Sequence, residues 1–479
     1  METAKREVHA QRLDGDVVDV LLEADGAEED QGGEQAVGGN ANGGGQNVDV
    51  EVQGGGADYE SGGYERTGDE RNDADGISDH DYDDNSDTDS DNDYDSWEDE
   101  TPPLNLSYEA IKHIATYFLP GSHGKCIDIT TLRRGAFHEI RILHFEDCWT
   151  CIGRFTRDRE ALHKTESELA TIECVCKHTN IPVPEIYFVN YNENHVVGAA
   201  FVLMERIEGD RLSDIWDDLS MPHKISVIEQ TAHIVGQLAE LRFDRIGSLK
   251  SDGTVGPLLN TSRGLHEELE GPFTDTLSYF FAGLNEKRLH RGEQSMALYP
   301  AIKEQLRASL SSEASNPTLQ APYRLIHDDF NTWNIMVTQP TKSLPPIITG
   351  VIDWDWAFVG PLYYLCEYPP TIIDFQKEEE TFADNKMLRK HFVKTVAQHF
   401  PKGSADREAV KQCFREKTEL LNGFKTLFAT CVHSDLEEER IMTASYLKGI
   451  RGEDEGYPVN PYGDCVDWVP DSDPETDEE

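Results

Sequence analysis

The segments His327-Asp-Asp-Phe-Asn-Thr-Trp-Asn334 and Val351-Ile-Asp-Trp-Asp355 are the most informative part of this sequence. The first segment follows a short apolar run and places an Asp five residues before an Asn. On a short loop, this spacing lets the Asp329 carboxylate face an attacking hydroxyl while the Asn334 amide oxygen faces a magnesium ion. In the second segment, Asp353 follows two apolar residues and is placed to hold the metal that bridges nucleotide phosphates. The pattern indicates phosphoryl-transfer chemistry.

Charge is unevenly distributed along the 479 residues, whose net charge is −48. Residues 1–100 contain 32 acidic and five basic side chains, together with glycine runs and few aromatic residues. Such a composition cannot bury enough apolar surface to offset the entropy of folding. We therefore predict a disordered, acidic, glycine-rich segment over residues 1–101 and an acidic disordered tail over residues 451–479, with the folded region between them.

The negative charge also limits the classes of partner. Nucleic acids and anionic membranes would be repelled, and no stretch approaches the roughly 20 apolar residues that cross a bilayer. We therefore expect no nucleic-acid or membrane partner. The Asp-rich run from Asp79 to Glu100 fits a solvated, self-repelling tail, and the alternative is docking of a basic protein partner on the acidic arms.

Two features of the sequence bear on the compartment. The N-terminus leads into acidic sequence without the apolar core of a secretory signal. The nine cysteines are odd in number and spread from Cys126 to Cys465, which suits reduced thiols rather than a disulfide framework. We expect a cytoplasmic protein, with the nucleus as the other possibility.

Hydrophobic periodicity divides the folded region into two parts. Alternating residues over 132–155 predict three antiparallel strands, two more strands are expected near residues 185–189 and 200–205, and helical spacing appears after Ser107 and over 160–177.

Beyond Gly209 the pattern becomes mostly helical, with a strong apolar stripe over residues 225–241. Strands followed by helices predict an α+β fold with two lobes. We expect a small lobe over residues 102–208, with an antiparallel sheet and one main helix, and a large, mostly helical lobe over residues 209–450.

The two opening segments resemble the catalytic loop and the metal-binding acid of the aminoglycoside phosphotransferase and choline kinase-like family, whose fold is protein-kinase-like. Other stretches are similar to fungal members of that family: Ile181–Pro184, Leu203–Gly209, Ile246–Leu249 and Gly271–Phe273. The similarity covers roughly residues 105–440 and is absent from both acidic ends.

The resemblance implies a role for each polar residue of the two segments. Asp329 would orient or deprotonate the acceptor hydroxyl, Asn334 would help to hold magnesium, and Asp353 would be the principal metal ligand. His327 would brace the loop by hydrogen bonding. Asp355 is a second metal candidate, although alternation in an extended segment would send it toward solvent instead. The alternative is that Asp329 and Asp353 are ordinary acidic residues of turns, without a role in catalysis or metal binding.

Five residues of the small lobe would serve ATP. Arg154 lies where the resemblance expects the lysine that contacts the phosphates, with Glu168 as its acidic partner, and the alternative for this pair is a surface ion pair. Gly135 would belong to a short phosphate-covering loop, or would simply close a hairpin. The main chain of Met204 and Glu205 would bind the adenine edge, unless these residues only end a buried strand.

These observations predict an ATP- and Mg²⁺-dependent phosphotransferase that moves the terminal phosphoryl group to a hydroxyl of a small molecule. The competing hypothesis is a noncatalytic, kinase-like interaction protein whose acidic arms bind a basic partner. Arg154, the single glycine of the phosphate loop and the uncharged Asn331 favour this alternative, because a lost cation near the loop weakens charge stabilisation.

Overall fold

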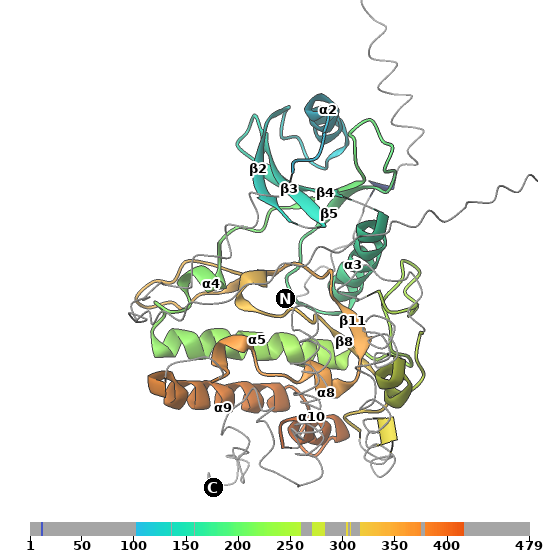
Figure 1. Ribbon diagram of the computed structural model, residues 1–479. Helices are drawn as coiled ribbons and strands as arrows, with labels where there is room; N and C mark the ends of the chain where they lie inside the picture. The colour runs from blue at the N-terminus through green and yellow to red at the C-terminus, as the bar shows by residue number, and fades with distance from the viewer. Residues whose placement is uncertain are drawn as a thin grey trace, which may run out of the picture. The chain divides into compact units, whose positions relative to one another are not determined.

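The computed structural model describes residues 11–12, 102–135, 137–157, 159–259, 271–282, 303–304, 307, 317–374 and 379–415. Within these ranges the elements follow the predicted α+β, two-lobed order (Figure 1). The predicted acidic ends lie outside the described residues, except for strand β1 (Gln11–Arg12), which pairs in parallel with β5 (Ile186–Asn190). The disorder of these ends stays a prediction, as do the domain boundaries.

An antiparallel sheet forms the small lobe, with the strand order β5-β6-β4-β3-β2. Besides β5, its strands are β2 (Cys126–Arg134), β3 (His138–Phe145), β4 (Thr150–Thr156) and β6 (Phe201–Glu205). The predicted strands are confirmed, but β2 begins six residues before the expected run. This strand lies at the sheet edge with most of its residues exposed, so its sequence lacks the alternation that a half-buried strand shows.

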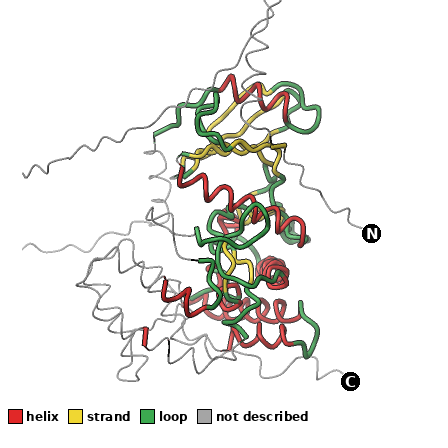
Figure 2. Tube along the Cα trace, turned by 90° about the vertical axis from the view of Figure 1, so that its right-hand side faces the viewer, coloured by secondary structure: helices red, strands yellow, loops and turns green. Residues whose placement is uncertain are grey.

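Two helices accompany the sheet. Helix α2 (Tyr108–Phe118) begins at the predicted cap, where the Ser107 hydroxyl accepts a hydrogen bond from the Ala110 amide at 3.4 Å. Helix α3 (Arg159–His178) lies between the sheet and the helices of the large lobe (Figure 2). Its second half contributes apolar side chains to a core that is shared by strands β5 and β6 and by the helices of the large lobe, namely Leu169, Ala170, Ile172 and Val175.

The segment after α3 is held against the large lobe by backbone hydrogen bonds. The Val351 amide donates to the Pro182 carbonyl at 2.9 Å, and the Asn180 amide donates to the side-chain oxygen of Gln237 at 2.7 Å. The two prolines of the predicted extended run Ile181–Pro184 keep this segment out of a helix. Helix α3 and its following loop are therefore fixed to the large lobe.

The large lobe is built around helices α5 (Met221–Glu240) and α9 (Phe382–Gln398), which lie side by side (Figure 1). They approach closely at Gly236, where a Cβ atom would lie 2.6 Å from Cγ of His399. The other helical elements are α4 (Leu212–Ile215), α8 (Leu362–Leu365), α10 (Ala405–Arg415), and the 3₁₀ turns η4 (Pro370–Ile372) and η5 (Glu379–Thr381). None of the helices in the described ranges has the length and apolar character needed to cross a bilayer.

Two small sheets position the segments that the sequence singles out. One has the order β10-β9-β7 and the other pairs β11 with β8; their strands are β7 (Asp210–Arg211), β8 (Arg324–Ile326), β9 (Ile335–Val337), β10 (Ile348–Val351) and β11 (Phe358–Gly360). Val351 pairs with Ile335, and Phe358 pairs with Ile326. Both pairings bring the 327–334 loop beside the 352–357 segment.

Candidate active site

The segments 327–334 and 351–355 are joined by hydrogen bonds. The Ile352 amide donates to the Asn334 carbonyl at 3.0 Å, and Nε2 of His327 donates to the Ile352 carbonyl at 3.1 Å. His327 is buried, and burial lowers its pKa although the nearby Asp353 opposes this. A neutral imidazole that donates through Nε2 has the hydrogen bonding expected of a loop brace.

The Asp329 carboxylate is held by two side-chain amides. Nδ2 of Asn334 donates to Oδ2 of Asp329 at 2.8 Å, and Nδ2 of Asn331 donates to Oδ1 at 2.6 Å. Asn331 also caps the 3₁₀ turn η3 (Thr332–Asn334), because its Oδ1 accepts from the Trp333 amide. Asn331 thus supplies no positive charge but fixes the carboxylate that the sequence predicts to face the acceptor.

Two aspartates near the site have left-handed backbone conformations. Asp328 has φ of 62° and Asp353 has φ of 64°. Non-glycine residues pay about 1–2 kcal/mol for this region, although Asp and Asn tolerate it better than most. Such strain is concentrated at functional sites. At Asp353 it also interrupts the extended run of β10, so that alternation cannot be applied to the residues that follow.

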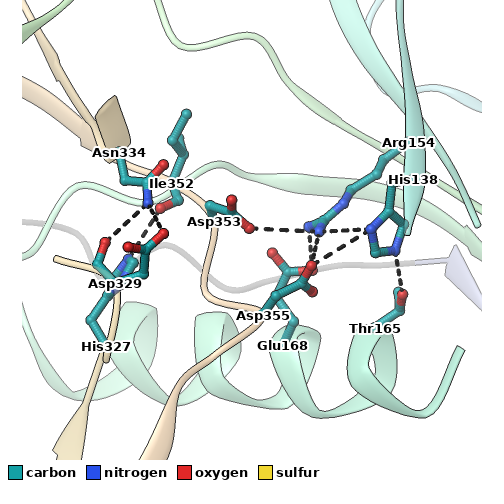
Figure 3. A network of polar contacts seen from close by, with 10 residues as sticks. All are labelled: His138, Arg154, Thr165, Glu168, His327, Asp329, Asn334, Ile352, Asp353 and Asp355. Carbon is teal, nitrogen blue, oxygen red and sulfur yellow. Dashed lines mark hydrogen bonds and ion pairs between the residues drawn. The ribbon is translucent and has the colours of Figure 1, made fainter. Parts of the chain in front are cut away.

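Arg154 is the centre of a buried polar network (Figure 3). One guanidinium nitrogen donates to Glu168, and the other donates to Asp355 and lies 3.8 Å from Asp353. The side chains of Arg154, Glu168 and Asp355 are 10%, 2% and 8% exposed. Arg154 and Glu168 therefore form the predicted pair, and the alternative of a surface ion pair is wrong.

Burial and charge oppose each other in this network. Burial disfavours the charged guanidinium, but the carboxylates of Asp355, Glu168 and Asp353 outweigh it and raise the pKa of Arg154. Burial raises the pKa of Glu168 well above its ordinary range and also raises that of Asp355, against the effect of Arg154. A cation bound beside these acids would oppose the effect of burial and lower both pKa values.

The three acids form the group that could hold a metal ion. Oxygen atoms of Glu168, Asp353 and Asp355 lie within 4.8 Å of one another. Asp355 Oδ1 is buried and has no hydrogen-bond partner among the described residues. The alternative that sends Asp355 to solvent is wrong, because the left-handed turn at Asp353 redirects the chain toward Arg154. The sequence did not predict Glu168 within this group.

Asn334, the third predicted metal ligand, lies on the other side of Asp353 from Arg154 (Figure 3). Its Nδ2 donates to both the carboxylate and the carbonyl of Asp329. The amide oxygen is therefore the atom of Asn334 that is suited to a metal ion. The structure brings Asp353 and Asp355 together with Glu168, whereas Asn334 contacts Asp329.

Gly135 closes the hairpin between β2 and β3. Its amide donates to the His138 carbonyl at 2.8 Å, and its carbonyl accepts from Nε of Arg157 at 2.8 Å. This N–H cannot donate to a phosphate at the same time. The hairpin interpretation of Gly135 describes the observed contacts, and its role in phosphate binding stays a prediction.

Replacing Gly135 by Ala is therefore expected to change the Kd for MgATP by less than about threefold and stability by less than about 1 kcal/mol. The added Cβ atom would lie 3.3 Å from the His138 carbonyl, and the glycine does not occupy the left-handed region. Nucleotide titration and urea unfolding of the variant would check this. A tenfold rise in Kd would indicate that the Gly135 backbone approaches the phosphates.

Met204 and Glu205 end strand β6, as predicted, and Met204 pairs with Ile152 on β4. The Glu205 amide donates to the Glu185 carbonyl at 2.8 Å. This donor is therefore engaged and is not available to an adenine edge. Their contact with adenine stays a prediction.

Sequence reasoning missed two residues beside the site. His138 accepts from Arg154 through Nδ1 at 3.1 Å and donates through Nε2 to the Thr165 hydroxyl at 3.0 Å; burial and the Arg154 charge lower its pKa well below the ordinary value. Trp333 is 55% exposed, and its ring centroid lies 5.6 Å from the guanidinium carbon of Arg211. A lone Trp inside a polar loop was the available signal for Trp333, but nothing in the sequence distinguished His138.

The two lobes, with the amide-held Asp329 and the acid group around Arg154 between them in the chain order expected, have the architecture of a kinase-like fold. Residues 137–364 match the sequence profile of the phosphotransferase enzyme family, APH. This part of the chain is therefore similar to that family, and the predicted resemblance is confirmed.

Curated relatives match the chain over parts of their length. A subtelomeric hrmA-associated cluster protein of Aspergillus fumigatus is 32% identical over 126 residues, which cover 26% of this chain and 25% of that protein. Altered inheritance of mitochondria protein 9, mitochondrial, of Debaryomyces hansenii is 33% identical over 232 residues, which cover 42% of this chain and 36% of that protein. The chain thus spans about a quarter to a third of the length of these relatives.

Solved structures are similar at lower identity. ADP-bound aminoglycoside phosphotransferase APH(2'')-Ib is 13% identical with a TM-score of 0.43, covering 72% of this chain and 97% of that one. The apoenzyme of macrolide 2'-phosphotransferase MphH from Brachybacterium faecium is 15% identical with a TM-score of 0.39, covering 71% and 97%.

Proposed function

We propose that this domain transfers the terminal phosphoryl group of ATP, with Mg²⁺, to a hydroxyl group of a small molecule. The observation that carries the proposal is the juxtaposition of two chemistries. A carboxylate fixed by two amides, Asp329, lies on a loop that is hydrogen-bonded to the segment carrying the acids Asp353 and Asp355. The match of residues 137–364 to a phosphotransferase family supports the same reaction class.

Each residue has a distinct part in this proposal. Asp329 accepts the proton of the acceptor hydroxyl, because both of its oxygens are oriented by amide donors. His327 holds the loop to Ile352 and so sets the distance between Asp329 and Asp353. Arg154 directs its charge to the nucleotide phosphates, and its forked geometry suits phosphate oxygens.

The oxygen-rich donor set fits magnesium, which prefers carboxylates, amide oxygens and phosphates. Asp353, 45% exposed, would hold the ion together with the amide oxygen of Asn334, and Asp355 offers a buried Oδ1 nearby. When bound, the ion would neutralise charge on the phosphates during transfer. Burial disfavours the charged forms of Glu168 and Asp355, and a divalent cation at this place would offset that cost.

Replacing Asp353 by Asn is expected to abolish the Mg²⁺-dependent stabilisation of the domain by ATP. For the wild type, ATP and Mg²⁺ together at 100 times Kd would stabilise the fold by about 2.7 kcal/mol, which raises Tm by several degrees. Asn retains the left-handed backbone that Asp353 adopts, so the variant keeps its fold. Thermal-shift titrations with ATP, with Mg²⁺ and with both would measure the effect.

Asp328→Asn is the matched control, because Asp328 shares the same left-handed conformation and is exposed. It should respond to MgATP like the wild type. An Asp353→Asn variant that is stabilised as strongly as the control would contradict the proposed metal site. A wild type that shows no shift at millimolar MgATP would overturn the proposed function.

A noncatalytic interaction protein is the second candidate, and two contacts favour it. The guanidinium of Arg154 is already engaged by Glu168 and Asp355, and the Gly135 amide is engaged in its own hairpin. In that case the acidic arms would bind a basic protein partner. The thermal-shift titration separates the two candidates, since only the phosphotransferase requires ATP and Mg²⁺ together.

For the compartment we propose the cytosol or the nucleus. The seven cysteines in the described ranges are all free thiols, which supports a reducing environment. Microscopy of the fluorescently tagged chain would test this, and a mitochondrial or secreted pattern would contradict it.

A further inference from the structure

Lys164 is a buried cation on helix α3, one turn before Glu168. Its side chain belongs to a residue that is only 3% exposed. The ammonium nitrogen lies 4.1 Å from the ring centroid of Phe137 and 4.2 Å from that of Trp356. Both distances are within the range of cation–π attraction, which strengthens when the cation is removed from water. The burial of Lys164 is therefore compensated in part by two aromatic rings.

The two rings belong to different parts of the site. Phe137 lies in the turn between β2 and β3, two residues after Gly135. Trp356 follows the metal candidates, three residues after Asp353. The rings themselves meet edge to face, with centroids 6.3 Å apart and an interplanar angle of 76°. We call Phe137, Lys164 and Trp356 the aromatic clamp.

The turn on one side of the clamp is well held by its own hydrogen bonds. The Arg157 amide donates to the Phe137 carbonyl at 2.9 Å, and the Arg157 side chain donates to the Gly135 carbonyl. A displacement of Phe137 would therefore move the turn that contains Gly135. The position of that turn and the position of the acid segment are linked through one lysine.

Helix α3 supports the clamp and the acid group from the same side. Glu168 pairs with Arg154, and Thr165, adjacent to Lys164, binds His138. The charge of Lys164 acts on Asp355 and on His138, so the ammonium is electrostatically coupled to two of the neighbours of Arg154. Lys164 is thus placed between the turn, the helix and the acid segment.

We propose that Lys164 is a positioning residue for nucleotide binding, which fixes the position of Gly135 and Phe137 relative to the Asp353–Asp355 segment through the faces of Phe137 and Trp356. This inference rests on the proposed function, because fixing the turn beside the acid segment matters only if the phosphates of a nucleotide bind there. Lys164 itself does not touch the reacting atoms. Phosphate contact remains with Arg154.

Lys164→Met tests the proposal, because Met fills similar space without charge. The variant is expected to raise the Kd and KM for MgATP about tenfold, with kcat changed less than about threefold, since Asp329 is untouched. Lys177→Met, on the exposed last turn of the same helix, is the matched control and should leave Kd unchanged. Equal Kd values for wild type and Lys164→Met would overturn the proposal.

A double-mutant cycle distinguishes positioning from simple packing. Trp356→Leu should raise Kd about as much as Lys164→Met, and the double variant should be little worse than either single variant, because the same contact is lost once. Trp356→Phe retains a ring and should restore most of the affinity. Additive losses, or a Phe variant as poor as the Leu variant, would contradict a shared cation–π contact.

A nucleotide-independent readout separates failure of this inference from failure of the proposed function. Hydrogen exchange of the Gly135 and Arg157 amides reports the turn directly, since both amides donate within it. Lys164→Met should accelerate their exchange at least about tenfold relative to Lys177→Met. A wild type that binds no MgATP would contradict the proposed function, whereas unchanged amide exchange in Lys164→Met would contradict the positioning role of Lys164.

Discussion

Replacing Asp329 by Asn is expected to lower kcat by about three orders of magnitude, because a positioned general base contributes about 10²–10⁴ in rate. The Kd for MgATP should change less than about threefold, since Asp353 and Arg154 are untouched. The new amide can still accept from Asn334 or Asn331, but not from both, so a loss of about 1 kcal/mol in stability accompanies the change. Transfer of labelled phosphate from ATP to a metabolite pool, with parallel nucleotide titration, measures both quantities.

Asp328→Asn is again the control, because it makes the same chemical change at the preceding, exposed residue. Its turnover should equal that of the wild type. If Asp329→Asn turned over as fast as this control, the carboxylate would have no part in proton transfer. If it lost nucleotide binding together with turnover, Asp329 would belong to the metal site instead.

Removal of the buried guanidinium should produce the largest change in stability. Arg154→Met leaves Glu168 and Asp355 buried without their partner, and breaking a buried ion pair in this way costs about 3–5 kcal/mol. The stability of Arg154→Lys should fall between that of the wild type and that of Arg154→Met, because one ammonium cannot reproduce the fork that contacts both carboxylates. Urea unfolding at pH 7.5 would give the free energies.

Two comparisons make this prediction specific. Arg206→Met removes an exposed arginine that reaches only the Thr150 hydroxyl and should stay within about 0.5 kcal/mol of wild type. Adding Asp355→Asn to Arg154→Met should recover part of the loss, because one uncompensated charge is gone. An Arg154→Met variant as stable as Arg206→Met would show that the network contributes nothing to the fold.

The pH dependence of Arg154→Met provides a further check of the same cause. Groups with a raised folded-state pKa bind more protons in the folded than in the unfolded protein above their ordinary pKa, so they favour folding as pH falls. Burial raises the pKa values of Glu168 and Asp355, and Arg154 opposes this rise, so removing Arg154 raises both pKa values further than in the wild type. The deficit of Arg154→Met should therefore shrink between pH 8 and pH 6.

Much of the small lobe could be predicted from local patterns. Alternation over residues 138–145 and 150–156 predicts two strands, and Ser107 marks a helix start by its capping chemistry. The long edge strand β2 was harder, because its exposed residues carry no period. Elements specified by the pattern of nearby residues were predictable, whereas the start of β2, which is specified by pairing at the edge of the sheet, was not.

The site was predictable as a set of residue types but not as a set of contacts. The spacing of Asp329, Asn334 and Asp353 indicated the chemistry, whereas the direction of Asp355 depended on a left-handed turn that a period-two pattern ignores. The contact of His138 with Arg154 joins adjacent strands through side-chain orientation. Such orientations follow from packing, which sequence spacing does not encode.

The attachment of α3 to the large lobe has a consequence for control of the domain. To withdraw Glu168 from Arg154 by swinging the helix, the protein would have to expose Ile172 and Val175 to water, at about 1.5–3 kcal/mol for each buried side chain, and release Pro182 from Val351. A helix held in this way is poorly suited to regulate the domain by moving away from Arg154. The Arg154–Glu168 ion pair is already formed without a ligand. The rate of the proposed reaction would therefore follow the concentrations of nucleotide and acceptor.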